Sequence, residues 1–126
     1  MTVEITCKVR GNAFQIPFEK IAVKILGKKY SLSLVLSGDK LARRINRTYR
    51  KKDYPSNVLS FPLGSSESEI FLNVRKAERE ARQFGITARE RVALLFIHGC
   101  LHLRGMKHGH KMEVEERTVL KRFGFK

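Results

Sequence analysis

At 126 residues, 42% of them hydrophobic, the chain is long enough for one hydrophobic core and too short for two, so we expect a single domain over residues 1–126. No apolar run approaches the ~20 residues that a membrane-spanning helix needs, and charged residues interrupt the N-terminal segment, which together predict a cytoplasmic protein without membrane contact. The formal net charge of +14 is spread along the whole chain, which favours nucleic acid over a membrane surface or a small molecule as the partner.

The first element is predicted to be a strand. Residues 2–9 alternate between apolar and polar side chains, the pattern of a half-buried strand, with Cys7 on the apolar face. The second cysteine, Cys100, lies far along the chain, and two such residues do not make a disulfide framework. We expect both cysteines to be reduced, buried packing residues.

A helix and a second strand follow. Residues 17–26 carry apolar side chains at helical spacing, with Pro17 suited to the first helical position and Gly27 to the helix end. Residues 30–36 alternate again, which predicts a strand.

The middle of the chain predicts a helix and two more strands. Ser37 can cap a helix that runs toward Tyr49. The polar segment 50–56 then breaks the helical pattern. Residues 57–61 and 69–73 have the character of strands, with a turn rich in Gly and Ser between them.

The C-terminal half is predicted to be helical. Residues 74–84 are rich in Glu, Arg and Ala, and a glycine follows that can end a helix. Thr87 and Glu90 then form a capping box, and residues 92–97 behind it are apolar nearly all round, so this helix should lie in the core and end near Gly105.

A last helix is expected over residues 113–123. Strands and helices in this order predict an α+β fold, a small mixed β-sheet of about four strands with helices packed on it.

Three histidines near the end of the core helix predict a metal site. His98 and His102 are four residues apart, so their side chains lie on one face of the helix. Gly105 allows the chain to turn back and bring His108 to the same ion. Three protein ligands leave one position open, which is typical of catalytic zinc, where the ion either activates water or polarises a phosphodiester oxygen. We expect one Zn²⁺ per chain and place His110 on the surface.

Two other kinds of metal hydrolase are disfavoured. A zinc peptidase of the common helical type needs a glutamate directly after the first histidine as general base, and here that residue is Gly99. A metal hydrolase of small molecules has no need of so large a positive charge.

Three segments of the chain resemble the YbeY family, endoribonucleases that help to mature ribosomal RNA. The most specific of them is 98–108, and all three segments occur along the chain in the same order as in the family. These segments read HGCLHLRGMKH at 98–108, NRTYRKKDYPSNVLSFP at 46–62 and EIFLN at 69–73.

The resemblance implies roles for individual residues. His98, His102 and His108 would hold zinc, with His102 and Arg50 essential to catalysis. Arg50 would point its guanidinium into the cleft, where a planar guanidinium can pair with two phosphate oxygens. The resemblance also implies ribosomal RNA and the small ribosomal subunit as partners, with a ribosome-associated GTPase or a ribosomal protein as a further partner.

One position departs from the family pattern. The family usually carries an aspartate directly before the third histidine, where this chain has Lys107. Loss of a carboxylate near a metal site typically weakens binding or hydrolysis by ~10–100-fold. The last helix offers three replacements, Glu113, Glu115 and Glu116.

Two functions follow from these features. The leading one is a zinc-dependent, single-strand-specific endoribonuclease that acts in ribosomal RNA maturation, at the 3′ end of the small-subunit RNA, and in ribosome quality control. The alternative, motivated by Lys107, is a ribosome-associated RNA-binding factor whose zinc is structural and whose hydrolytic activity is vestigial.

Overall fold

The computed structural model describes residues 2–9 and 15–125, which form a four-stranded sheet and five helices. In chain order the elements are β1 (Thr2–Cys7), α1 (Phe18–Leu26), β2 (Ser31–Ser37), α2 (Asp39–Arg50), β3 (Val58–Gly64), β4 (Glu67–Asn73), α3 (Val74–Phe84), α4 (Ala88–Leu103) and α5 (His110–Arg122). The predicted α+β fold with a small mixed sheet is therefore confirmed.

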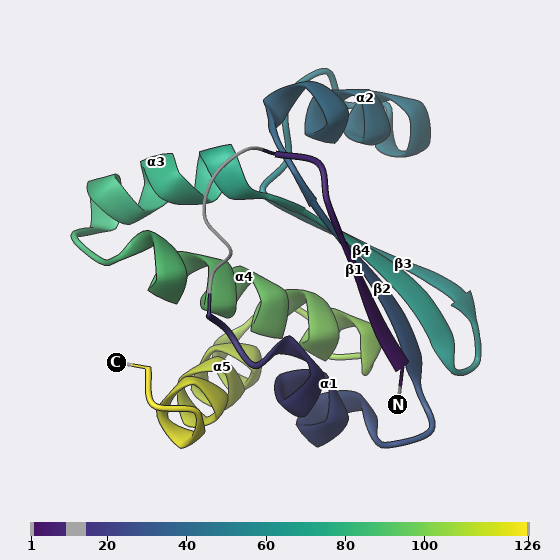
Figure 1. Ribbon diagram of the computed structural model, residues 1–126, viewed down its shortest axis with the longest axis vertical. Coiled ribbons are helices and arrows are strands. Elements are labelled where there is room, and N and C mark those ends of the chain that lie inside the picture. Colours follow the sequence, from purple (N-terminus) through teal and green to yellow (C-terminus); the bar gives the residue numbers. More distant parts are fainter. Residues whose placement is uncertain (1, 10–14, 126) are drawn as a thin grey trace.

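The sheet divides the helices into two layers. Its strands lie in the order β1-β2-β4-β3, with β1, β2 and β4 parallel and β3 antiparallel to β4. Helices α1, α4 and α5 lie on one side of the sheet, whereas α2 stands alone on the other (Figure 1). The loop from α2 leads to β3, which is the edge strand of the sheet next to β4.

Helix α4 is the centre of the core. Its N-cap, Thr87, accepts a hydrogen bond from the backbone N–H of Glu90, as the capping box predicts. The apolar residues of α4 are buried nearly all round the helix, and Phe96 meets Phe18 of α1 edge to face, with ring centroids 4.8 Å apart. None of the helices in the described residues is both long and apolar enough to span a bilayer.

The prediction for one cysteine is wrong. Cys100 is buried in the core, where loss of solvent raises the pKa of its thiol. Cys7 is exposed instead, and Ile5 on the same strand is 51% exposed. The reason is the place of β1 at the edge of the sheet, where the helices cover the apolar face only in part.

Several element boundaries also differ from the prediction. Ser37 is the buried last residue of β2 and caps no helix, because the N-cap of α2 is Gly38. Pro17 is the N-cap of α1, one residue before the predicted position. Helix α5 begins at His110, directly after Gly109, whose φ of 150° reorients the chain at that point.

Candidate metal centre

Three histidines converge where α4 ends. His98 and His102 lie one turn apart on α4, and His108 comes from the loop between α4 and α5. Their ligand nitrogens all lie within 4.8 Å of one another, and Nε2 of His102 is 3.0 Å from Nε2 of His108. Gly105 adopts a φ of 102°, which reverses the chain after α4 and returns His108 toward the helix. The structure thus brings the three predicted ligands together.

A close approach between α4 and β3 positions the first histidine. Ser60 of β3 donates a hydrogen bond from Oγ to the carbonyl oxygen of Gly99, at 3.2 Å. A Cβ atom at Gly99 would lie 3.0 Å from that Oγ and 3.2 Å from Cδ1 of Ile70. Glycine is therefore needed for the helix to lie this near the sheet, and it holds the adjacent His98 close to the strand.

A carboxylate from α5 orients His98. Nδ1 of His98 hydrogen-bonds to the carboxylate of Glu116, and their side chains are 22% and 13% exposed. Glu116 is thus the one of the three glutamates considered above that contacts the cluster, whereas Glu115 lies 3.8 Å from Arg104. Because Nδ1 is hydrogen-bonded to Glu116, Nε2 is the nitrogen of His98 that remains to bind a metal ion.

The environment of His102 favours its neutral form. Burial lowers the pKa of this imidazole, and the neighbouring His98 and His108 lower it further. A neutral imidazole is the form that binds a metal ion.

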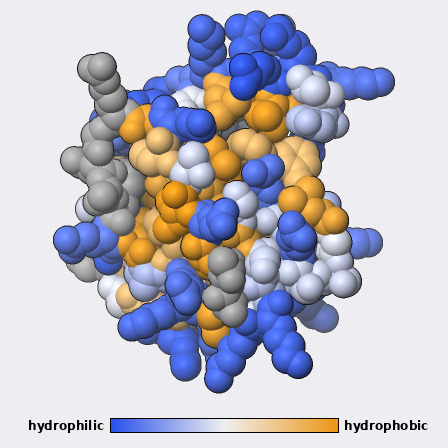
Figure 2. All heavy atoms as spheres, turned by 45° about the vertical axis from the view of Figure 1, so that its right-hand side comes forward, coloured by the Kyte–Doolittle hydropathy of each residue, from blue (hydrophilic) through white to orange (hydrophobic). Residues whose placement is uncertain are grey.

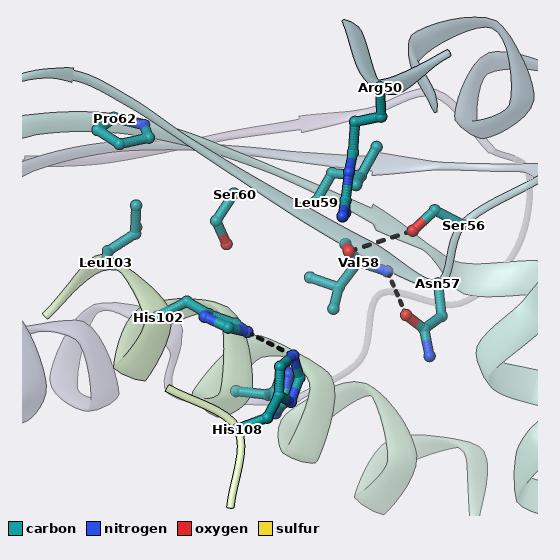
Figure 3. Close-up of a pocket in the computed structure, with 11 residues that line it drawn as sticks. Arg50, Ser56, Asn57, Val58, Leu59, Ser60, Pro62, His102, Leu103 and His108 are labelled. Atoms are coloured by element: carbon teal, nitrogen blue, oxygen red, sulfur yellow. Dashed lines mark hydrogen bonds between the residues drawn. The ribbon is translucent and has the colours of Figure 1, made fainter. Parts of the chain in front are cut away.

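A cavity of about 520 Å³ opens beside the histidines (Figure 3). Its walls come from the end of α2, the loop after it, β3, α4 and the loop after α4. The lining residues are Arg50, Ser56, Asn57, Val58, Leu59, Ser60, Pro62, His98, His102, Leu103 and His108. Arg50 is the last residue of α2, and its side chain points across the cavity toward the side on which His102 and His108 lie (Figure 3).

A buried asparagine shapes the loop between α2 and β3. Asn46 is 1% exposed, and its Nδ2 donates a 2.9 Å hydrogen bond to the carbonyl oxygen of Tyr54. Lys51, just past the helix end, adopts a left-handed conformation with a φ of 57°. These features turn the chain back after Arg50 and carry Ser56 into the cavity wall.

Part of this wall was not predicted from the sequence. Ser56, Asn57 and the cavity face of β3 had no expected role. The alternation of side chains along a strand could have indicated this face, because Val58, Ser60 and Pro62 are two residues apart and therefore lie on the same side of β3. Only the tertiary structure shows that this face meets the histidines.

Two residues near the histidines lie outside the cluster. His110 is exposed at the first position of α5, on the surface as expected. Lys107 is also exposed, directly before His108.

The donor set fits a transition metal. Within residues 2–9 and 15–125, these histidines are the group that could hold an ion. Three imidazoles with a carboxylate behind one of them are a common zinc environment. The adjoining cavity gives a substrate access to the ligand atoms.

The sequence also matches a known family over nearly its whole length. The family described as Endoribonuclease YbeY matches residues 6–124. A relative of that name from Aquifex aeolicus is 35% identical over 117 residues, which cover 87% of this chain and 77% of the relative. Another from Geobacter metallireducens is 33% identical, in an alignment that covers 94% of this chain and 89% of the relative.

The fold has a counterpart among solved structures. The solution structure of a Thermotoga maritima protein matches with a TM-score of 0.71 and 23% identity, over 97% of this chain and 89% of that one. At this identity the likeness supports the fold alone.

Proposed function

Since this chain belongs to the YbeY endoribonuclease family, we propose that it is a zinc-dependent endoribonuclease that cleaves single-stranded RNA during the maturation of ribosomal RNA. We further propose that it acts at the 3′ end of the small-subunit RNA and in ribosome quality control. Its partners would be the small ribosomal subunit and a ribosome-associated GTPase or ribosomal protein, in the cytoplasm.

One observation carries this proposal. Arg50 from α2 lines the same cavity as His98, His102 and His108, although the two parts of the chain are about fifty residues apart in sequence. A guanidinium and a metal-ligating cluster around one cavity suit a phosphodiester, because both groups act on its oxygens.

The histidines would hold one zinc ion. A zinc ion bound there supplies Lewis-acid polarisation of a phosphodiester oxygen or activation of a water molecule. The hydrogen bond between His98 and Glu116 fixes the ring that faces the ion. The lowered pKa of His102 keeps that ring neutral and ready to bind.

Arg50 would bind the scissile phosphate. Its five N–H donors can pair with two phosphate oxygens at once, which orients the phosphorus toward the histidines. Negative charge on these oxygens grows as the new P–O bond forms and the old one breaks, so the guanidinium stabilises the transition state more than the ground state. The apolar walls at Val58, Leu59 and Leu103 lower the local dielectric, which strengthens this attraction.

Changing Glu116 to Gln should lower zinc affinity by about 10–100-fold, because the neutral amide forms a weaker hydrogen bond to His98 and no longer raises its basicity. The substitution conserves shape, so the fold should persist. Competition with a chromogenic chelator measures the affinity. Glu115→Gln is the matched control, since Glu115 lies on the same helix and pairs with Arg104. Equal affinities for the two variants would count against an orienting role for Glu116.

Lys107 keeps the second candidate function open. A positive charge directly beside His108 repels a divalent cation, and it supports a ribosome-associated RNA-binding factor with structural zinc and vestigial hydrolysis. This charge is exposed, however, so solvent screens it. The proposed enzyme therefore retains activity with Lys107 in place.

Changing Lys107 to Asp should raise zinc affinity by up to about tenfold. The change replaces a charge that repels the ion with one that attracts it, and the interaction of such an exposed charge with the ion contributes about 1 kcal/mol. Zinc content and RNA cleavage are measured on the same preparations of wild type and Lys107→Asp, with Lys121→Asp as an equal charge change at the far end of α5. If the chain is an active endoribonuclease, the wild type should hold about one zinc ion and cleave RNA. If both proteins hold zinc and bind RNA but leave it intact, the chain is an RNA-binding factor with structural zinc.

A further inference from the structure

Helix α2 carries a line of cations that leads to the cavity. Lys40, Arg43, Arg47 and Arg50 are spaced by three, four and three residues, so they lie on one flank of the helix. The buried positions Ala42 and Asn46 face the sheet, and the basic flank stays open to solvent. The side chains of Arg43 and Arg47 are 53% and 61% exposed.

The same flank borders a second depression in the surface. This groove, of about 1010 Å³, is lined by Lys8, Val9, Gly38, Asp39, Lys40, Leu41, Arg43, Arg44, Arg47, Pro55 and Arg79. It adjoins the cavity at two points. Pro55 lines the groove and Ser56 lines the cavity, and Arg47 lines the groove one turn before Arg50. The groove and the cavity therefore border each other near the end of α2.

This surface is strongly positive. Six cationic side chains line the groove, and the nearby carboxylates are Asp39 and Asp53. Asp39 pairs with Arg79, which lowers its pKa to about 2. Asp53 pairs with Arg43 and lies 3.7 Å from Arg47. Figure 2 shows hydrophilic side chains at the top of the molecule, where α2 lies in Figure 1, as well as at the bottom of this face.

We propose that Lys40, Arg43 and Arg47 form a phosphate-binding track for the RNA strand whose scissile phosphate lies at Arg50. This inference rests on the proposed function and adds how the substrate is held outside the cavity. Ten residues of helix between Lys40 and Arg50 span about 15 Å. An extended strand laid along the helix can therefore place successive phosphates against these cations.

The position of the track beside the cavity favours the RNA substrate of the proposed function as its occupant. The chain is basic overall, so positive charge alone does not distinguish this surface. The track differs because its line of cations ends at Arg50, which lines the same cavity as the histidines. Arginine and lysine side chains bind the backbone without reading its bases, so the track supplies affinity and register, not sequence preference.

The test compares two double variants that each lose two positive charges. Lys40→Gln with Arg47→Gln removes part of the track, and Arg43 is kept to preserve its ion pair with Asp53. Lys121→Gln with Arg122→Gln, at the exposed end of α5, is the matched control. Both are made with His102→Ala so that the RNA stays intact, and circular dichroism verifies the fold.

The track variant should bind a twelve-nucleotide single strand about tenfold more weakly than the control, and its plot of log affinity against log salt should be less steep by about 1.4, since each lost phosphate contact removes about 0.7. A dinucleotide, whose single phosphate can lie at Arg50, should lose little affinity, because it does not extend along the track to Arg47 and Lys40. Restoring Arg47 as Lys should recover part of the loss.

Separate outcomes identify which idea fails. If the two double variants bind the long RNA equally, the track is wrong, while cleavage by the wild type still supports the proposed function. If the wild-type chain neither binds nor cleaves RNA, the track and the proposed function both fail.

Discussion

Replacing His102 with Ala should remove the bound metal and reduce RNA cleavage by more than about 10³-fold. Two imidazoles hold zinc far less tightly than three, and a metal ion contributes several kcal/mol of transition-state stabilisation, each 1.36 kcal/mol being a factor of ten in rate. Metal analysis and cleavage of an end-labelled single-stranded RNA measure the two effects on one preparation.

The control for this variant is His110→Ala. His110 is exposed at the start of α5, outside the cluster, so its loss should leave metal content and cleavage close to wild type. His102 lines an open cavity, so its truncation should leave the fold intact. If His102→Ala retained a full equivalent of zinc, the ligand set proposed here would be wrong.

Replacing Arg50 with Ala should lower kcat by about 10²–10³-fold while zinc content stays unchanged. This magnitude is typical for the loss of one group that stabilises developing oxyanion charge. Arg50 lines the cavity but lies outside the histidine cluster, so the metal site should survive its removal. Steady-state kinetics on a short RNA separate kcat from KM.

Two further variants sharpen this result. Arg50→Lys keeps the charge but loses bidentate pairing, so it should recover only part of kcat. Arg82→Ala removes an exposed arginine at the end of α3 and should have no effect on kcat. If Arg50→Ala changed KM alone, Arg50 would bind the substrate without stabilising the transition state.

Local signals predicted much of the fold. The helix over residues 74–84 has the predicted bounds, because Asn73 caps its start and Gly85, with a φ of 68°, ends it. The core helix is also confirmed, since its capping box and apolar residues act within the helix itself. Such features depend on neighbours in sequence, so they can be recognised without the tertiary structure.

Features that depend on tertiary contacts were harder to predict. The alternation of residues 2–9 indicates a strand but not that it lies at the sheet edge, and this is why Cys7 was wrongly expected to be buried. The i, i+4 spacing was enough to predict that His98 and His102 lie on one face of the helix. The choice of Glu116 required the packing of α5 on α4. For Arg50, the place in the cavity was implied by the family resemblance and by no local signal.

If the proposed function is right, RNA cleavage depends on one zinc ion held by His98, His102 and His108. The most direct measurement strips the wild-type chain of metal with a chelator, removes the chelator and follows cleavage of single-stranded RNA while zinc is added back. We expect no cleavage without zinc, and a linear rise with added zinc that levels off at about one equivalent per chain. Undiminished cleavage by the stripped protein, or no recovery at any zinc concentration, would contradict it.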